Sequence, residues 1–517
     1  MSAAPTITEI DGVEVHWRAL PGRLRADLVF RAGAVDEAFH TLGTGHLVEH
    51  LAFVEVEDLD PDVNGSSGML TTTFQVEGTP EKVARQLRSL CQGISELADG
   101  SLPSARIEHE KRILAAEGDV SALGEPAVAE ALTVRYGLRG PGLAGVSSRF
   151  IEKLTDAEIR SFAREYFTRG NALLVLTGEP PAGLQLPLPE GARRSVPEFD
   201  PVPLVLPGEY TTGGEDLVLS FQVPGMSAEV DPVARLVLGT LRRRTFRQLR
   251  RDAGVVYDIE AGQALQPRSG VAVIIVRTAQ SSLRQAAEGI LGILRELRDH
   301  GVTDADRQAA HQEVQDQLED PHHETVELFE AAEAAFLQAP QPALEDLGAA
   351  VRAVTDEDVR AWLADLDSTL AVGVPDQDHA EEPEPGTPGL VAPVMGPQPG
   401  PDVTGTVYPV KLFARLAGAP KGLKLIVGDD GVLITDGQFR RSLAWDQVAA
   451  VEQDASDPDD VQTTIAGLNG EVIEVPTVAL KGGDRAVDQI CQHVPPRRQI
   501  TTRPRDDRAE HSGQEPA

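Results

Sequence analysis

The sequence has only two cysteines, Cys91 and Cys491, which lie 400 positions apart among 517 residues. Two such distant thiols cannot build a disulfide framework or a zinc site made of thiolates. Long hydrophobic runs are also missing, since no stretch approaches the roughly 18 apolar residues of a membrane-spanning helix. The first residues lack the basic segment and apolar segment of a secretory signal. We therefore expect a soluble, cytoplasmic protein without a membrane span.

Basic residues are scarce relative to acidic ones: 47 Lys and Arg stand against 81 Asp and Glu, giving a formal net charge of −34. A surface this acidic repels phosphate backbones, so nucleic acid is not an expected partner. Six arginines between Arg242 and Arg251 are an exception. Because apolar residues occur at helical spacing in the same segment, we interpret them as the basic face of a helix. A nucleic-acid site is the less favoured alternative.

An internal repeat indicates how the chain is organised. At 517 residues, of which 41% are hydrophobic, the chain is long enough for several cores. Thr155 and Thr355 each stand where a helix N-cap is expected, with an acidic residue three positions later. Each predicted helix leads into a strand-like segment, and each unit begins with an alternating one. The pattern predicts an α+β protein with two homologous α/β-sandwich units, at residues 1–198 and 199–375.

The C-terminal part of the sequence has a different pattern. Residues 376–402 are rich in Pro, Gly and acidic residues, which predicts a linker without a packed core. Short strands with turns between them and one amphipathic helix follow at residues 403–495, and this plan resembles a small, mainly-β pleckstrin-homology-like domain. We favour protein docking over lipid binding for this domain, since it shows no concentrated basic face. Residues 496–517 are polar and are predicted to be a disordered tail.

One short motif carries the strongest chemical signal. The sequence GTGHLVEHLAF, residues 43–53, places two of the 12 histidines four positions apart around a glutamate. On a helix, His46, Glu49 and His50 would lie on one face, because positions i, i+3 and i+4 are neighbours. Catalytic zinc takes three protein ligands and keeps a fourth position for water. The motif could supply two ligands and a base, whereas the competing interpretation is a solvated helix face.

A third ligand would have to come from elsewhere in the chain. The segment ARIEHEKRILAAEGDV, residues 105–120, contains Glu110 and Glu117, which would lie on one face of a helix two turns apart. Glu117 can act as a ligand while Glu110 supports a ligand from behind. Without the histidine motif, both would be interpreted as solvated charges on an acidic protein. The adjacent His322 and His323 form a second candidate cluster, which we interpret as a helix end exposed to water.

The motif H-x-x-E-H resembles that of the insulinase and pitrilysin zinc peptidases, whose small members include the mitochondrial processing peptidases. The resemblance covers about residues 8–375. FRAGAVDE is similar to the strand and turn before the family's zinc helix, EHEKRILAAEG to the helix with the third ligand, and NALLVLTGE to the strand that closes the first domain. The resemblance implies that His46, His50 and Glu117 bind one Zn²⁺ per chain. Glu49 would be the general base that activates water for attack on a peptide carbonyl.

The resemblance extends to the predicted second unit. LRRDAGVVYDIEA, residues 249–261, resembles the family's Arg-x6-Tyr segment. Arg250 and Tyr257 would accordingly donate hydrogen bonds to the substrate backbone or to the oxyanion. Without the resemblance, they would be a surface arginine and a half-buried strand aromatic.

A departure from the family's pattern concerns the substrate. In GSSGMLTTTF, residues 65–74, Gly68 and Met69 stand where the family's edge strand has Asn-Ala. A peptide would add to this edge as a further strand, alongside Gly68, Met69 and Thr71. The missing asparagine side chain implies a changed specificity, while the zinc chemistry is unaffected.

The family's architecture also implies an assembly. Its short members resemble one half of a two-half chamber, in which the Arg-Tyr pair reaches the zinc site of the opposite half. We therefore expect a homodimer, or a heterodimer with a related subunit, that cleaves peptides or unfolded segments. The expected function is that of a zinc metallopeptidase. The alternative is a non-catalytic subunit that binds peptides or acts as a scaffold.

Overall fold

The computed structural model describes residues 4–53, 62–117, 125–146, 149–227, 230–339, 342–376, 385–396, 398, 400–455 and 461–502. The chain forms two compact units. The first comprises Met1–Arg135, Gly140–Asp200 and Leu204–Gly396, and the second comprises Tyr136–Arg139, Pro201–Pro203 and Pro397–Ala517. Among the described residues, no helix combines the length and the apolar character needed to cross a membrane.

The first sheet of the first unit has six strands in the order β1-β2-β6-β3-β5-β4. Strand β6 is parallel to β2 and antiparallel to β3. All residues of β6 are buried, as expected for a central strand covered on both faces. Strand β4 forms an edge of this sheet and pairs only with β5. The strands are β1 (Thr6–Ile10), β2 (Val13–Trp17), β3 (Leu24–Phe30), β4 (Val63–Ser67), β5 (Thr72–Gly78) and β6 (Ala172–Leu176).

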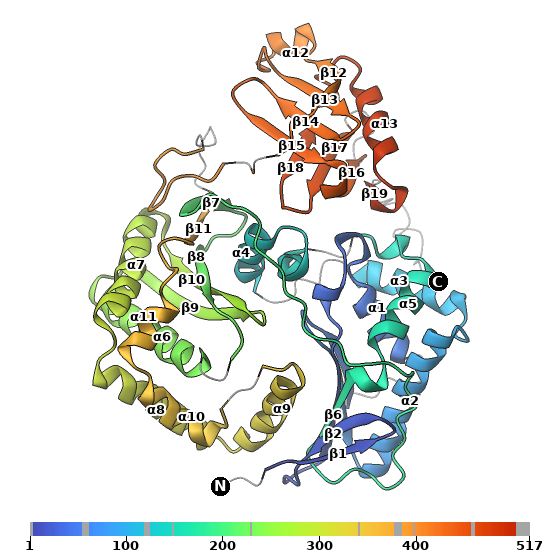
Figure 1. Ribbon diagram of the computed structural model, residues 1–517, viewed down its shortest axis with the longest axis vertical. Coiled ribbons are helices and arrows are strands. Elements are labelled where there is room, and N and C mark those ends of the chain that lie inside the picture. The colour runs from blue at the N-terminus through green and yellow to red at the C-terminus, as the bar shows by residue number, and fades with distance from the viewer. Residues whose placement is uncertain are drawn as a thin grey trace, which may run out of the picture. The chain divides into compact units, whose positions relative to one another are not determined.

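Helices from the same part of the chain cover this sheet (Figure 1). The longest, α2, begins after Thr79, whose side chain accepts a hydrogen bond from the Lys82 amide, with a proline in the first turn. Its buried leucines join the strands in one hydrophobic core. The helices of this core are α1 (Thr44–Ala52), α2 (Pro80–Asp99), α3 (Ser104–Glu117) and α5 (Asp156–Tyr166), whereas α4 (Pro126–Tyr136) contributes no described residue to it.

The second sheet repeats the topology of the first. Its order is β7-β11-β8-β10-β9, with β11 parallel to β7 and antiparallel to β8. Strands β2, β6, β3, β5 and β4 therefore correspond to β7, β11, β8, β10 and β9, and β1 has no counterpart in this sheet. Thr155 and Thr355 cap the equivalent helices α5 and α11, each with a capping box, as the sequence predicts. The strands are β7 (Gly208–Thr212), β8 (Leu217–Pro224), β9 (Val256–Leu265), β10 (Ser269–Thr278) and β11 (Ala371–Pro375).

The helices of this second part share a core with its sheet. Helix α6 continues into a π-helical segment, η7, which contains part of the predicted arginine-rich helix. The elements are α6 (Val230–Thr245), η7 (Phe246–Asp252), α7 (Leu283–His300), α8 (Asp304–Leu318), α9 (His323–Phe336), α10 (Leu344–Ala353) and α11 (Asp356–Trp362).

In the first unit, a helix from each half contacts the sheet of the other half. On α9, Leu328, Ala332 and Phe336 pack against Val29 and Leu173 of the first sheet. In the opposite direction, Arg135 of α4 donates hydrogen bonds to the side chain and carbonyl of Ser220 on β8 and to the carbonyl of Thr369. Because each sheet is covered by a helix from the other half of the unit, the two halves depend on each other for burial.

Part of the predicted linker is packed instead. The carboxylate of Glu209, a buried residue of β7, accepts hydrogen bonds from the backbone amides of Leu390, Val391 and Ala392. Leu390 and Val391 also contact the core of the second sheet. Composition predicted no packing for residues 385–396, because Pro and Gly reduce regular structure. The segment is held in place because the buried carboxylate of Glu209 requires hydrogen-bond donors, and its backbone amides supply them.

The C-terminal unit contains two four-stranded sheets and the helices α12 and α13. The sheet orders are β12-β13-β14-β15 and β18-β17-β16-β19, with β19 joining β16 in parallel. Helix α13 packs its apolar face on a core shared by the strands, and the likeness to the pleckstrin-homology plan stays a prediction. The elements are β12 (Gly405–Pro409), α12 (Leu412–Leu416), β13 (Lys424–Gly428), β14 (Gly431–Thr435), β15 (Arg440–Ala444), β16 (Val448–Asp454), β17 (Gln462–Gly467), β18 (Val472–Val475), α13 (Gly483–His493) and β19 (Gln499–Thr502).

The end of the folded chain differs from the prediction. The sequence predicted a disordered tail from residue 496, but Gln499–Thr502 form β19, the edge strand beside β16. This polar segment is ordered because backbone pairing with β16 needs no apolar side chains. The rest of the predicted tail, residues 503–517, lies outside the described residues.

Candidate metal centre

Helix α1 is held in place by contacts at its N-terminus and along its apolar face. The carboxylate of Glu37 accepts hydrogen bonds from the amides of Thr44 and Gly45, at 3.1 and 2.9 Å. These amides have no partner within the helix, and a carboxylate near them also interacts favourably with the helix dipole. Leu47 and Leu51 are fully buried on the opposite face. Glu37 belongs to the segment FRAGAVDE, but local spacing alone gives no sign of this role.

The predicted residues of α1 lie together. One nitrogen or oxygen atom each from His46, Glu49 and His50 can be chosen so that all lie within 4.8 Å of one another. His46 Nε2 is 3.6 Å from Glu49 Oε2, and the two imidazole rings are 4.8 Å apart between centroids. Glu49 is buried, with its side chain 8% exposed. The helix therefore brings two imidazole rings and a carboxyl group together at one place.

Helix α3, which packs against α1, adds two carboxylates around His50 (Figure 1). Glu117 Oε2 lies 3.8 Å from His50 Nε2, and Glu110 Oε2 lies 3.5 Å from His50 Nδ1. The two glutamates therefore lie beside different nitrogens of one imidazole ring. The roles expected from the sequence, with Glu117 as a metal ligand and Glu110 as the partner that supports His50, stay predictions.

Burial and charge perturb the titration of this cluster. Burial, with a further contribution from the Glu117 carboxylate, raises the pKa of Glu49 to about 7. Burial also lowers the pKa of His46, and the neighbouring His50 lowers it further. A neutral imidazole is the form that binds metals, and a glutamate with a raised pKa can exchange a proton near neutral pH.

The edge strand β4 closes over Glu49. A β-carbon added at Gly65 would lie 2.1 Å from Glu49 Oε1, so only a glycine allows this approach. Gly65 is not among the site residues expected from the sequence. Its signal is a glycine inside a predicted strand, which indicates close approach of the backbone to another group.

The residues predicted for the substrate edge lie elsewhere. Gly68, Met69 and Thr71 were placed on the edge strand, but β4 ends at Ser67 and they form the turn to β5. The carbonyls of Gly68 and Met69 accept hydrogen bonds from the amides of Ala34 and Val35, at 3.1 Å each. Thr71 Oγ1 donates to Glu333 on α9. The Gly68 amide donates to the Thr71 carbonyl, next to the last β4–β5 pair, so that Met69 and Leu70 form the loop of a hairpin.

Arg250 and Tyr257 are exposed on the second half of the unit. Arg250 lies in η7, with its guanidinium 5.0 Å from the centroid of the Phe246 ring. Tyr257 is in β9, the edge strand of the second sheet, and is exposed rather than half-buried. Among the residues described, neither side chain has a hydrogen bond or ion pair with the α1 cluster.

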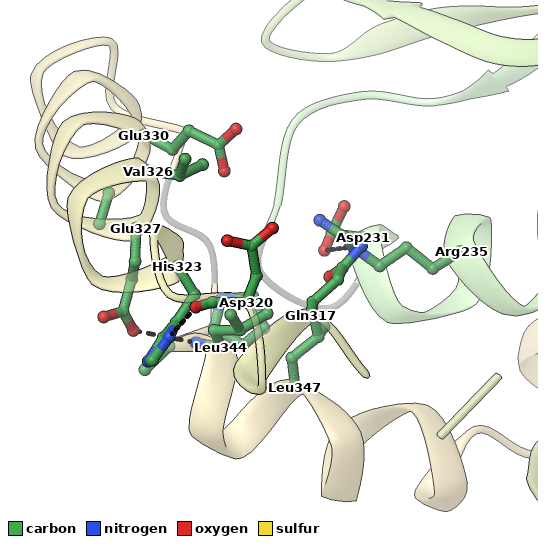
Figure 2. Close-up of a pocket in the computed structure, with 13 residues that line it drawn as sticks. Asp231, Arg235, Gln317, Asp320, His323, Val326, Glu327, Glu330, Leu344 and Leu347 are labelled. Carbon is green, nitrogen blue, oxygen red and sulfur yellow. Dashed lines mark hydrogen bonds and ion pairs between the residues drawn. The ribbon is translucent and has the colours of Figure 1, made fainter. Parts of the chain in front are cut away.

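The competing histidine cluster borders a separate cavity of about 430 Å³. His323, the first residue of α9, lines it together with Asp320, Glu327 and Glu330, and Figure 2 shows Arg235 on the opposite side. His323 Nδ1 lies 2.7 Å from the Asp320 carbonyl. Within the described parts of the chain, the only cluster of three potential metal ligands is the one on α1. His322 is exposed at the start of α9, as predicted, whereas His323 is partly buried.

Comparison with known proteins identifies the fold. Residues 153–314 match the family model described as the peptidase M16 inactive domain. This range contains Arg250 and Tyr257 and none of the residues of the α1 cluster. No curated protein matches the chain.

Solved structures are similar over most of the chain. A protease from Helicobacter pylori is 14% identical, with a TM-score of 0.59, over 73% of this chain and 100% of its own. The peptidase M16 inactive domain from Pseudomonas fluorescens is 16% identical, with a TM-score of 0.59 and the same shares covered. Pitrilysin is 16% identical, with a TM-score of 0.57, over 72% of this chain and 44% of its own. The chain therefore has an M16-like α+β fold with several sheets, and these relatives belong to the M16 and pitrilysin peptidases.

Proposed function

We propose that the protein is a zinc-dependent peptidase whose catalytic centre lies on α1 and α3. The observation that carries this proposal is the position of the His50 ring between Glu117 and Glu110, with Glu49 buried one turn away. If α1 presented only a solvated face, two glutamates from another helix would not be expected beside the two nitrogens of one histidine. The M16-like fold supports the assignment.

The separation between two of the proposed ligand atoms is compatible with a zinc ion. Two ligands about 2 Å from a tetrahedral ion are roughly 3.3 Å apart. The 3.8 Å between His50 Nε2 and Glu117 Oε2 is close to this separation, and small rotations of the side chains would meet it. An ion held by His46, His50 and Glu117 would also offset the repulsion between the carboxylates of Glu117 and Glu49.

Each residue then has a distinct task. When bound, Zn²⁺ would polarise the peptide carbonyl and lower the pKa of water. Glu49 would accept a proton from the attacking water on its carboxylate and deliver it to the leaving amine. Glu110 would accept a hydrogen bond from His50 Nδ1 and so keep Nε2 free as a donor to the metal.

The substrates that suit this centre are peptides or unfolded segments. The backbone of β4 lies beside Glu49, and a peptide paired with such an edge would bring its carbonyls near the base. Arg250 and Tyr257 would complete the site of a second copy in a homodimer, or of a related subunit in a heterodimer, by donating hydrogen bonds to the oxyanion.

A non-catalytic subunit that binds peptides is the second candidate. It is favoured by the match of residues 153–314 to a domain described as inactive. That range lies outside the α1 cluster, so the label concerns the second half of the unit. A scaffold does not need a buried glutamate between two histidines, so the position of Glu49 favours the peptidase.

The test is Glu49→Gln in the full chain, with zinc content and peptide hydrolysis measured together. We expect native zinc binding and a loss of turnover of about 10²- to 10⁴-fold, because only the proton acceptor is removed. Glu81→Gln, on the exposed surface of α2, serves as the matched control. Hydrolysis unaffected by Glu49→Gln, or a native chain that binds zinc and cleaves no peptide of a mixed library, would favour the non-catalytic subunit.

A further inference from the structure

The short helix α12 of the C-terminal unit exposes large apolar side chains. Leu412, Phe413 and Leu416 are 66%, 57% and 82% exposed. The segment after β18 lies beside the start of the helix, because the Lys411 amide donates to the Ala479 carbonyl and its Nζ donates to the Val478 carbonyl. We call Leu412, Phe413, Leu416 and the exposed Val478 the α12 face. Soluble proteins rarely expose apolar groups in this density without a binding partner.

The charge around the α12 face is opposite to that of the protein as a whole. Residues 403–428 contain four basic residues and no Asp or Glu, in a chain with 81 acidic residues. A further lysine, Lys481, is adjacent, because its amide donates to the Pro409 carbonyl. The acidic residues on neighbouring segments are Asp436, whose carbonyl lies beside Gly422, and Asp484 at the start of α13. The basic residues are Lys411, Arg415, Lys421, Lys424 and Lys481.

We propose that the α12 face binds the surface of an anionic phospholipid bilayer. The apolar side chains would enter the boundary between headgroups and acyl chains, and the basic residues would contact lipid phosphates. The formal charge of −34 does not prevent this, because charges further away than the Debye length of about 8 Å are largely screened.

The shape of the α12 face favours a lipid surface over an acidic protein. Its apolar side chains project from a helix of five residues, and Leu416 is almost free of contacts with the rest of the unit. A peptide segment would need a concave groove for its own side chains, whereas a soft interface accepts projecting ones. The sequence favoured protein docking because the basic residues look dispersed. Backbone pairing of residues 409–411 with 479–481 brings Lys481 and Val478 to the others.

The experiment is flotation of the full chain with vesicles of phosphatidylcholine alone or mixed with phosphatidylglycerol. We expect binding only to the mixed vesicles, and weaker binding as salt is raised. The double variants Arg415→Glu/Lys421→Glu and Leu412→Ser/Leu416→Ser should each lower the partition coefficient by about tenfold or more. All four residues are exposed, so these changes leave the core intact.

Matched controls separate the α12 face from general charge and hydrophobicity. Arg85→Glu/Arg88→Glu makes the same change of charge on exposed positions of α2, and Ile7→Ser/Val205→Ser removes two other exposed apolar side chains. Both controls should bind like the native chain. The proposal is overturned if native protein ignores phosphatidylglycerol, or if the α12 variants bind as the controls do. Binding of a polyglutamate peptide in place of vesicles would indicate an acidic protein partner instead.

Discussion

Gly65 of the edge strand and Glu49 of α1 are in direct contact, so that a β-carbon at residue 65 would lie 2.1 Å from Glu49 Oε1. The strand that would receive a peptide and the carboxylate that would accept a proton are therefore positioned against each other. The contact requires a glycine because the strand backbone itself forms the wall beside the base. This relationship makes the geometry of the base sensitive to a residue that carries no functional group.

The first prediction follows from that contact. Gly65→Ala would force the Glu49 carboxylate out of its position, while the distances between His50, Glu110 and Glu117 would not change. We expect zinc binding within about threefold of native and a fall in kcat of about 10²-fold, since a small displacement of a catalytic group has this effect. Peptide hydrolysis and zinc titration of the same preparation measure both quantities. Gly68→Ala, in the turn after β4, is the control, and equal losses in the two variants would contradict the prediction.

The second prediction concerns the pH dependence of stability in the metal-free protein. The folded pKa of Glu49 is raised from 4.5 to about 7, so the folded chain holds this proton more tightly than the unfolded chain. The contribution of Glu49 to the free energy of unfolding is therefore fully present below pH 4.5 and is lost as pH rises through 7. The difference amounts to at most about 3 kcal/mol. Denaturation of the native chain and of Glu49→Gln in the presence of a chelator should diverge with rising pH, the variant being more stable at pH 8. Parallel curves would show that Glu49 titrates normally.

The third prediction concerns Glu110. Glu110→Ala removes the carboxylate 3.5 Å from His50 Nδ1 and leaves all three proposed ligands in place. Zinc affinity should fall by about 10- to 100-fold, because the imidazole loses the partner that fixes its orientation. Competition with a chromophoric chelator measures this affinity. His109→Ala, the exposed neighbour on α3, should bind zinc as tightly as the native chain. Native affinity in Glu110→Ala would assign Glu110 to the solvated surface.

The fourth prediction concerns the buried ion pair that fixes the segment before α1. Arg31 bonds to Asp36 and donates to the Leu70 carbonyl, and the two side chains are 1% and 4% exposed. Arg31→Met should lower the free energy of unfolding by about 3–5 kcal/mol, because Asp36 would be left as an unpaired buried charge. Adding Asp36→Asn should restore part of the loss, and a double-mutant cycle from chemical denaturation measures the coupling. Additive losses would mean that the pair contributes no interaction energy.

Local patterns predicted much of the fold. The Thr155 and Thr355 caps were readable because a capping box depends on residues three positions apart. The alternation of apolar residues similarly indicated β3 and β8, since side chains on a strand point to opposite faces. Composition was a poorer guide at residues 385–396 and 499–502, where Glu209 and β16 supply partners that are distant in sequence.

The sequence by itself determined the H-x-x-E-H cluster of α1, because helical periodicity places His46, Glu49 and His50 on one face whatever the rest of the chain does. It also determined that Glu110 and Glu117 share a face of another helix. Only the tertiary structure decided that this face meets His50, that Gly65 lies against Glu49 and that the edge strand β4 ends at Ser67. Those contacts join elements far apart in the chain, and their geometry is set by the packing of α1, α3 and the sheet, which no local spacing encodes.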